Sequence, residues 1–159
     1  SSRRGRTGSS SPRPRFSSGR SAPGSSSRAW RELSCREDAV KIASDLLVAV
    51  VALLHVGFLV LEMFLWRGPV GRRVFGLPPE VMAGSASLAA NQGLYNGFLA
   101  AGLAWGLLLG PDGFGVKVFF LSCVLVAGVF GAATAKRSIL WIQAMPAALA
   151  LALVVLSRP

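Results

Sequence analysis

The stretch Leu46–Trp66, LLVAVVALLHVGFLVLEMFLW, decides the fold, because it is apolar apart from one histidine and one glutamate. A helix needs roughly 20 mostly apolar residues to cross a bilayer. Three further apolar runs follow, at about 88–109, 116–135 and 139–156. The sequence therefore predicts an all-α protein, a membrane-embedded four-helix bundle, in a domain that covers 36–159.

The breaks between these runs are short and carry turn residues. They are Arg67-Gly68-Pro69, Gly110-Pro111-Asp112-Gly113 and Lys136-Arg137-Ser138. Short connections predict that neighbouring helices are antiparallel. Pro78-Pro79-Glu80 predicts that the second helix begins before it enters the bilayer. Four spans place both termini on one side, and basic residues near both ends leave the orientation open.

The N-terminal region, residues 1–35, is basic and rich in Ser, Gly and Pro. The chain of 159 residues has a net charge of +10, and no acidic residue precedes Glu32. Such a segment buries too little apolar surface to offset its ordering entropy, so we predict that it is disordered. It is either a transit-type segment or a basic tail that meets lipid phosphates. We do not expect nucleic acid as a partner, because the interleaved aromatic residues of a nucleic-acid site are absent.

Polar groups inside the apolar runs are the candidate site. Seven residues separate His55 from Glu62, which puts them on one helix face about 10 Å apart along the axis. The whole predicted cluster is His55, Glu62, Asn91, Gln92, Tyr95, Asn96 and Gln143. It is either a hydrogen-bonded network that fixes the bundle or a polar site for a ligand, ion or proton. No nucleophile–base spacing or metal motif accompanies it, so we expect neither catalysis nor a bound metal.

Small residues mark the predicted helix contacts. Gly93 and Gly97 form a GxxxG pair, which permits close approach of another helix of this chain or of a second copy. Residues at regular helical spacing extend the prediction to Gly102, Gly106, Cys123, Ala127 and Gly131.

Three segments carry a resemblance to a known family. They are EMFLW at 62–66, Phe75-Gly76-Leu77 and LAANQGLYNGFLAAG at 88–102. They resemble a family of small bacterial four-helix membrane proteins that is classed only as a domain of unknown function. The resemblance covers about residues 40–156 and implies a membrane bundle without an assigned activity. Family members begin almost directly with the first helix, whereas here a basic extension precedes it.

Together these observations predict an integral membrane subunit of a larger complex rather than an enzyme. The extension favours a plastid thylakoid or mitochondrial inner membrane, in a photosynthetic or respiratory assembly, with the bacterial inner membrane as the alternative. The expected partners are the lipid bilayer and other membrane subunits. The chain itself encodes no cofactor site, although pigment or lipid could contact it in a complex. The competing function is a stand-alone protein that binds or transports a small solute, ion or proton.

Overall fold

The computed structural model describes the backbone of residues 24–158 and the side chains of residues 28–158. All regular structure in this part is helical, which confirms the predicted all-α class. The elements are α1 (Gly24–Met63), α2 (Pro69–Phe75), α3 (Pro79–Gly84), α4 (Ala86–Leu108), the 3-10 turn η1 (Gly110–Gly113), α5 (Phe114–Thr134), the π-helical turn η2 (Leu140–Ala144) and α6 (Met145–Leu156).

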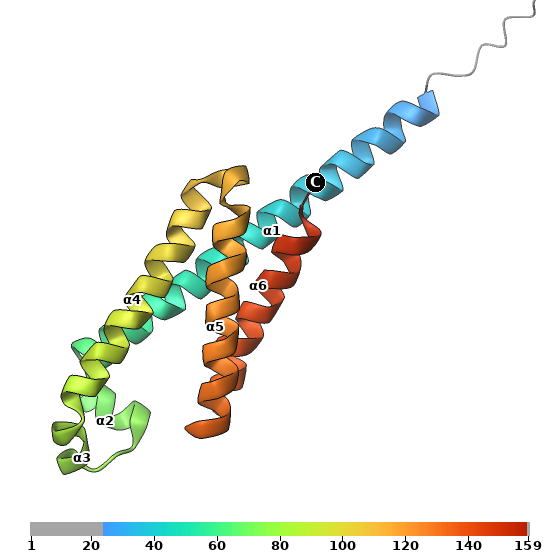
Figure 1. Ribbon diagram of the computed structural model, residues 1–159. Coiled ribbons are helices and arrows are strands. Elements are labelled where there is room, and N and C mark those ends of the chain that lie inside the picture. Colours follow the sequence, from blue (N-terminus) through green and yellow to red (C-terminus); the bar gives the residue numbers. More distant parts are fainter. Residues whose placement is uncertain (1–23, 159) are drawn as a thin grey trace, which may run out of the picture.

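The four long helices pack in a closed order. Helix α1 contacts α4 and α6, and α5 contacts the same two helices. Successive long helices run in opposite directions (Figure 1). Their shared core consists of Val48, Val51, Ala52, Leu103, Leu121, Val124, Ala147, Ala150 and Val154. These side chains come from all four helices and from all four apolar runs of the sequence.

Helix α1 includes the last twelve residues, 24–35, of the predicted basic extension. It is helical from Gly24, and every side chain from Arg28 to Ala39 is exposed. This part projects beyond the other helices (Figure 1). Residues 28–33 contain Arg, Ala, Glu and Leu, which are good helix formers, and a helix extends readily from an existing one. The rest of the predicted extension, residues 1–23, lies outside the described residues.

The second apolar run is preceded by two short helices instead of one continuous helix. Helix α3 ends at Gly84 and α4 begins at Ala86, with the Ser85 hydroxyl donating to the carbonyl oxygen of Val81 at 2.6 Å. Below the end of α1, the indole Nε1 of Trp66 donates to the carbonyl oxygen of Met82 at 2.9 Å. This part-buried contact closes residues 66–82 on themselves just after the end of α1, so the segment is not an open loop.

Two helical stretches in the described part are long and apolar enough to cross a membrane. They are Arg28–Met63 and Gly110–Thr134, while Leu140–Leu156 is apolar but shorter. Helix α4 has 23 residues, yet its amide side chains and glycines lower its mean hydropathy. By length and composition, the structure thus supports two of the four predicted spans and agrees with a membrane protein at this coarser level.

Candidate functional site

The closest polar contact between α1 and α4 joins Glu62 to Asn96. Asn96 is 6% exposed, and its Nδ2 donates to Glu62 Oε2 at 2.7 Å. The same nitrogen also lies 3.2 Å from the carbonyl oxygen of Gln92, one turn earlier in α4. A buried amide with a carboxyl partner is satisfied, so this pair holds the two helices in register.

The GxxxG pair positions this contact. Gly93 and Gly97 lie on either side of Asn96 along α4 and face α1. A Cβ atom on Gly93 would be 3.1 Å from the carbonyl oxygen of Leu59, and one on Gly97 would be 2.6 Å from Leu59 Cδ1. The two glycines therefore serve packing within this chain, and the close approach brings Asn96 within reach of Glu62.

His55 lies on α1 two turns before Glu62 and does not contact it. The ring is 1% exposed, and Nδ1 donates to the carbonyl oxygen of Val51 at 2.8 Å. The ring of Phe58 packs edge-on against it, with centroids 5.5 Å apart. Nε2 is buried without a hydrogen-bond partner among the described residues. In the neutral ring this nitrogen carries a free lone pair, and the hydroxyl of Ser44, eleven positions earlier in α1, is likewise buried without a partner among the described residues.

The remaining members of the predicted cluster lie elsewhere. Asn91, Gln92 and Tyr95 are exposed on the outer side of α4. Gln143 lies in η2, and its Nε2 donates to the carbonyl oxygen of Val124 in α5 at 3.3 Å. Among the seven predicted residues, the structure thus joins two side chains by a hydrogen bond, Glu62 and Asn96, and it places the others apart from this pair.

Glycines also bring α4 close to α5. Gly102 and Gly106 are both buried. A Cβ on Gly102 would overlap the ring of Phe120, and one on Gly106 would be 2.7 Å from Cγ of Lys117. Each glycine therefore accommodates one large side chain from the facing helix.

The small-residue stripe predicted on α5 does not follow the contact with η2 and α6. Ala127 is exposed, and Cys123 and Gly131 are half-buried, whereas Gly128 is buried. A Cβ on Gly128 would lie 2.8 Å from the backbone nitrogen of Ala144. A strict every-fourth spacing advances about 40° beyond a full turn at each step, so the stripe winds away from a fixed neighbour. The buried positions instead alternate between three- and four-residue steps.

Sequence reasoning missed the ion pair between Lys117 and Asp45. The Nζ of Lys117 lies 2.9 Å from Asp45 Oδ1, and the side chains are 9% and 37% exposed. Both residues sit at the edge of an apolar run, which suggested only that they flank the membrane. The sequence does give a signal: Lys117 lies alone inside the start of the third apolar run, and Asp45 lies just before the first. The two runs have to be placed antiparallel at the same level before this signal identifies a pair.

The chemistry of these sites is limited by what they contain. Among residues 28–158, no three His, Cys, Asp or Glu side chains gather closely enough to hold a metal ion. Cys35 and Cys123 are both free. Glu62 and His55 each carry a group that can exchange a proton, whereas the Asn96 amide can only form hydrogen bonds.

A family model described as protein of unknown function, DUF1304, matches residues 49–155, more than half of the chain. The chain belongs to this family. The match confirms the resemblance to a family of unknown function that the sequence segments indicated. It includes Glu62, Asn96 and Lys117, and it begins after Asp45 and the projecting part of α1. No curated protein matches the chain, and no solved structure does.

Proposed function

We propose that this DUF1304 member is an integral membrane protein in which α1, α4, α5 and η2–α6 form an antiparallel four-helix bundle across the bilayer. In the most apolar window of each of the two longest apolar stretches, only 22% of the residues are buried within the protein. The core helix of a soluble protein is mostly buried, whereas a helix in lipid exposes apolar side chains. Each of the four helices has such an exposed residue near its middle: Leu53, Phe98, Val126 and Leu149.

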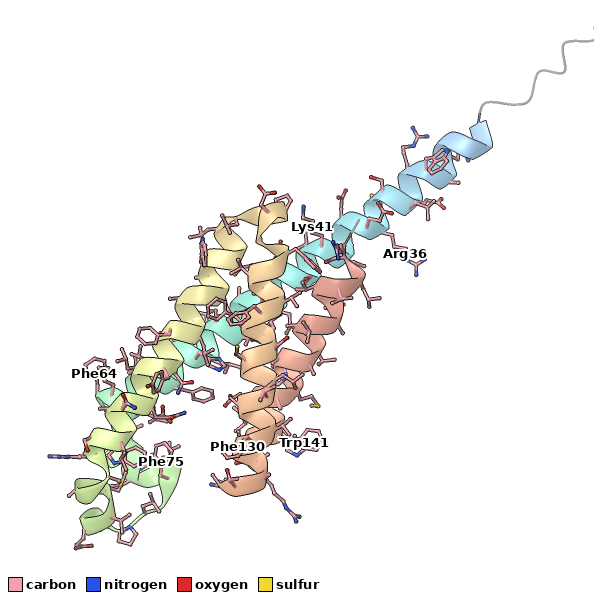
Figure 2. The ribbon with its side chains drawn as sticks, viewed as in Figure 1. Arg36, Lys41, Phe64, Phe75, Phe130 and Trp141 are labelled. Carbon is pink, nitrogen blue, oxygen red and sulfur yellow. The ribbon has the colours of Figure 1, made fainter. Side chains whose placement is uncertain are left out.

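The tryptophans support the same arrangement. Trp66 follows the end of α1 and Trp141 lies at the start of η2, so both are at one end of the antiparallel helices. Trp105 is one turn before the end of α4, at the opposite end. Figure 2 shows Trp141 and Phe130 at the outer end of the α5–η2 pair. Tryptophan is enriched at membrane–water interfaces, so these positions fit the two boundaries of a bilayer.

Within the membrane this protein acts, in our proposal, as a structural or accessory subunit of a larger complex. The observation that carries this proposal is the projecting part of α1. Trp30 is 71% exposed and Leu33 is 51% exposed, on a helix that no other described element covers. Apolar side chains on a helix outside the lipid favour a protein contact. An organellar inner or thylakoid membrane is the proposed location, with the bacterial inner membrane as the alternative.

A native pull-down in a mild detergent, followed by mass spectrometry, tests this function. The subunit proposal predicts a large stoichiometric assembly that is lost in Trp30→Ser/Leu33→Ser. Val74→Ser/Val81→Ser is the matched control, because it removes two exposed apolar side chains from α2 and α3. A chain that migrates alone or as a small homo-oligomer contradicts the subunit proposal. Equal loss of the partners in both double variants would contradict the role of the projecting helix.

The second candidate function is proton or solute movement through the bundle. It is favoured by the buried, unmatched Nε2 of His55 and by the carboxyl group of Glu62 on the same helix. Vesicles that contain the purified protein and an internal pH-sensitive dye test it. Proton flux that disappears in Glu62→Gln supports this function. Flux no higher than in empty vesicles excludes proton movement.

A further inference from the structure

A groove of about 620 Å³ lies where the projecting part of α1 passes the end of the bundle. One wall is α1, and the other consists of η1, the start of α5 and the end of α6. Figure 2 shows Arg36 and Lys41 on the stretch of α1 that passes the end of α6. The groove is separate from the Glu62–Asn96 contact, which lies toward the opposite end of α1.

The lining combines basic and apolar side chains. The bases are Arg36, Lys41, Lys117 and Arg158, and the acids Glu37 and Asp38 also line the groove. The apolar part consists of Leu33, Val40, Pro111, Phe114, Val154 and Leu156. Basic residues thus outnumber acidic ones beside a set of apolar side chains, which is the chemistry that complements a charged head with an attached hydrocarbon chain.

Two of the bases are held in place by the fold. Lys117 is 7% exposed, and its pairing with Asp45 uses one of the three N–H donors of an ammonium group. The guanidinium carbon of Arg158 lies 4.6 Å from the centre of the Phe114 ring, a cation–π geometry. Positions fixed before binding reduce the side-chain entropy that is lost when an anion binds.

The position of the groove along the helix axes indicates which class of anion it would bind. All four apolar runs end beside it: the first begins after Asp45, the second ends before Gly110, the third begins near Phe114 and the last ends at Leu156. In the proposed membrane arrangement this is the depth of the phospholipid headgroups. Basic pockets between helices at this depth bind anionic headgroups in other membrane proteins.

We propose that this groove binds an anionic phospholipid, with Lys41, Lys117 and Arg158 around the phosphate and with Phe114, Val154 and Leu156 along the start of an acyl chain. This inference rests on the proposed membrane embedding but not on the proposed subunit function. Arg36 extends the basic surface on the α1 side of the groove.

Lipid titration of the full chain in detergent, read by native mass spectrometry, tests this proposal. The probes are dioleoyl phosphatidylglycerol and dioleoyl phosphatidylcholine, which differ in net headgroup charge. We expect tighter binding of phosphatidylglycerol, and an apparent Kd that rises about tenfold or more in Lys41→Gln/Arg158→Gln. Lys117 is kept because its loss would disturb the ion pair. Arg72→Gln/Arg73→Gln, which removes two exposed charges on α2, is the matched control and should bind like the wild type.

Several results would overturn the assignment. Equal binding of the two lipids by the wild type would exclude selection of an anionic headgroup. This comparison uses the wild-type protein alone, so it does not depend on whether a variant folds. Equal weakening in both double variants shows general charge attraction. Displacement of the lipid by millimolar inorganic phosphate would show that the groove takes free phosphate instead. Release of the wild-type chain from membranes by alkaline carbonate would refute the embedding itself, which separates that failure from failure of the groove.

Discussion

Replacing Asp45 with alanine leaves the ammonium of Lys117 without its carboxylate. The Lys117 side chain is 9% exposed, so water reaches it poorly, and its only described partner is Asp45 at 2.9 Å. Breaking a buried pair in this way costs about 3–5 kcal/mol in proteins. Because Asp45 itself is 37% exposed, the pair is partly solvated, and we expect a loss of about 2–3 kcal/mol in the free energy of unfolding.

The reverse substitution should be much milder. Lys117→Met keeps an unbranched side chain against Gly106 and removes the buried charge. It leaves Asp45 partly exposed, where water can solvate the carboxylate. We therefore expect a change within about 1 kcal/mol. The double variant Asp45→Ala/Lys117→Met should be close to Lys117→Met alone, which gives a coupling energy of about 2 kcal/mol.

Unfolding of the detergent-solubilised chain in sodium dodecyl sulfate, followed by tryptophan fluorescence, measures all three variants. The expected order of loss is Asp45→Ala first, with the other two variants near the wild type. The reasoning is refuted if Lys117→Met destabilises as much as Asp45→Ala, because that equality would mean that the lysine is not buried beside the aspartate.

Three further predictions concern contacts between helices. Gly128→Val should destabilise the fold by about 1–3 kcal/mol, because a Cβ there meets the backbone of Ala144. Gly57→Ala should be neutral or slightly stabilising, because its Cβ would meet open space. Thermal unfolding of the two variants compares them. Asn96→Leu should destabilise by about 1–3 kcal/mol, while Glu62→Gln, whose amide oxygen can still accept from Asn96, should change unfolding by less than about 1 kcal/mol. Trp66→Phe removes the hydrogen bond to Met82, so limited proteolysis should cut residues 67–85 faster, and an unchanged rate would contradict the anchoring of this segment.

The parts of the fold that follow from local pattern could be predicted from the sequence. The apolar runs and the turn residues between them give the ends of the four long helices to within a few residues, except the start of α1. The helical start at Gly24 could not, because residues 24–35 have neither apolar periodicity nor a partner that would mark them as ordered. The break at Ser85 was not predicted either, because no proline or glycine–proline pair marks that position in the sequence.

The candidate site was only partly predictable for the same reason. Asn96 between two glycines is a local pattern that indicates a close helix approach, and the structure places it against Glu62. Which of the neighbouring amides would face inward required the rotation of α4 about its axis, and that is set by the facing helix. The pair of Lys117 and Asp45 needed tertiary placement, because 72 residues separate them along the chain.

The proposed membrane embedding requires that lipid covers the outward face of each of the four long helices. A membrane-impermeant maleimide tests it on single cysteines at Leu53, Phe98, Val126 and Leu149, one exposed position near the middle of each helix. Each substitution is made in a Cys123→Ser background, with exposed Cys35 as the internal positive control, in nanodiscs whose two faces are both open to water. In the proposed bundle Cys35 reacts while all four mid-helix cysteines stay unmodified, since lipid covers them. Reaction at any of the four at the rate of Cys35 would show that this helix faces water and would contradict the four-span bundle.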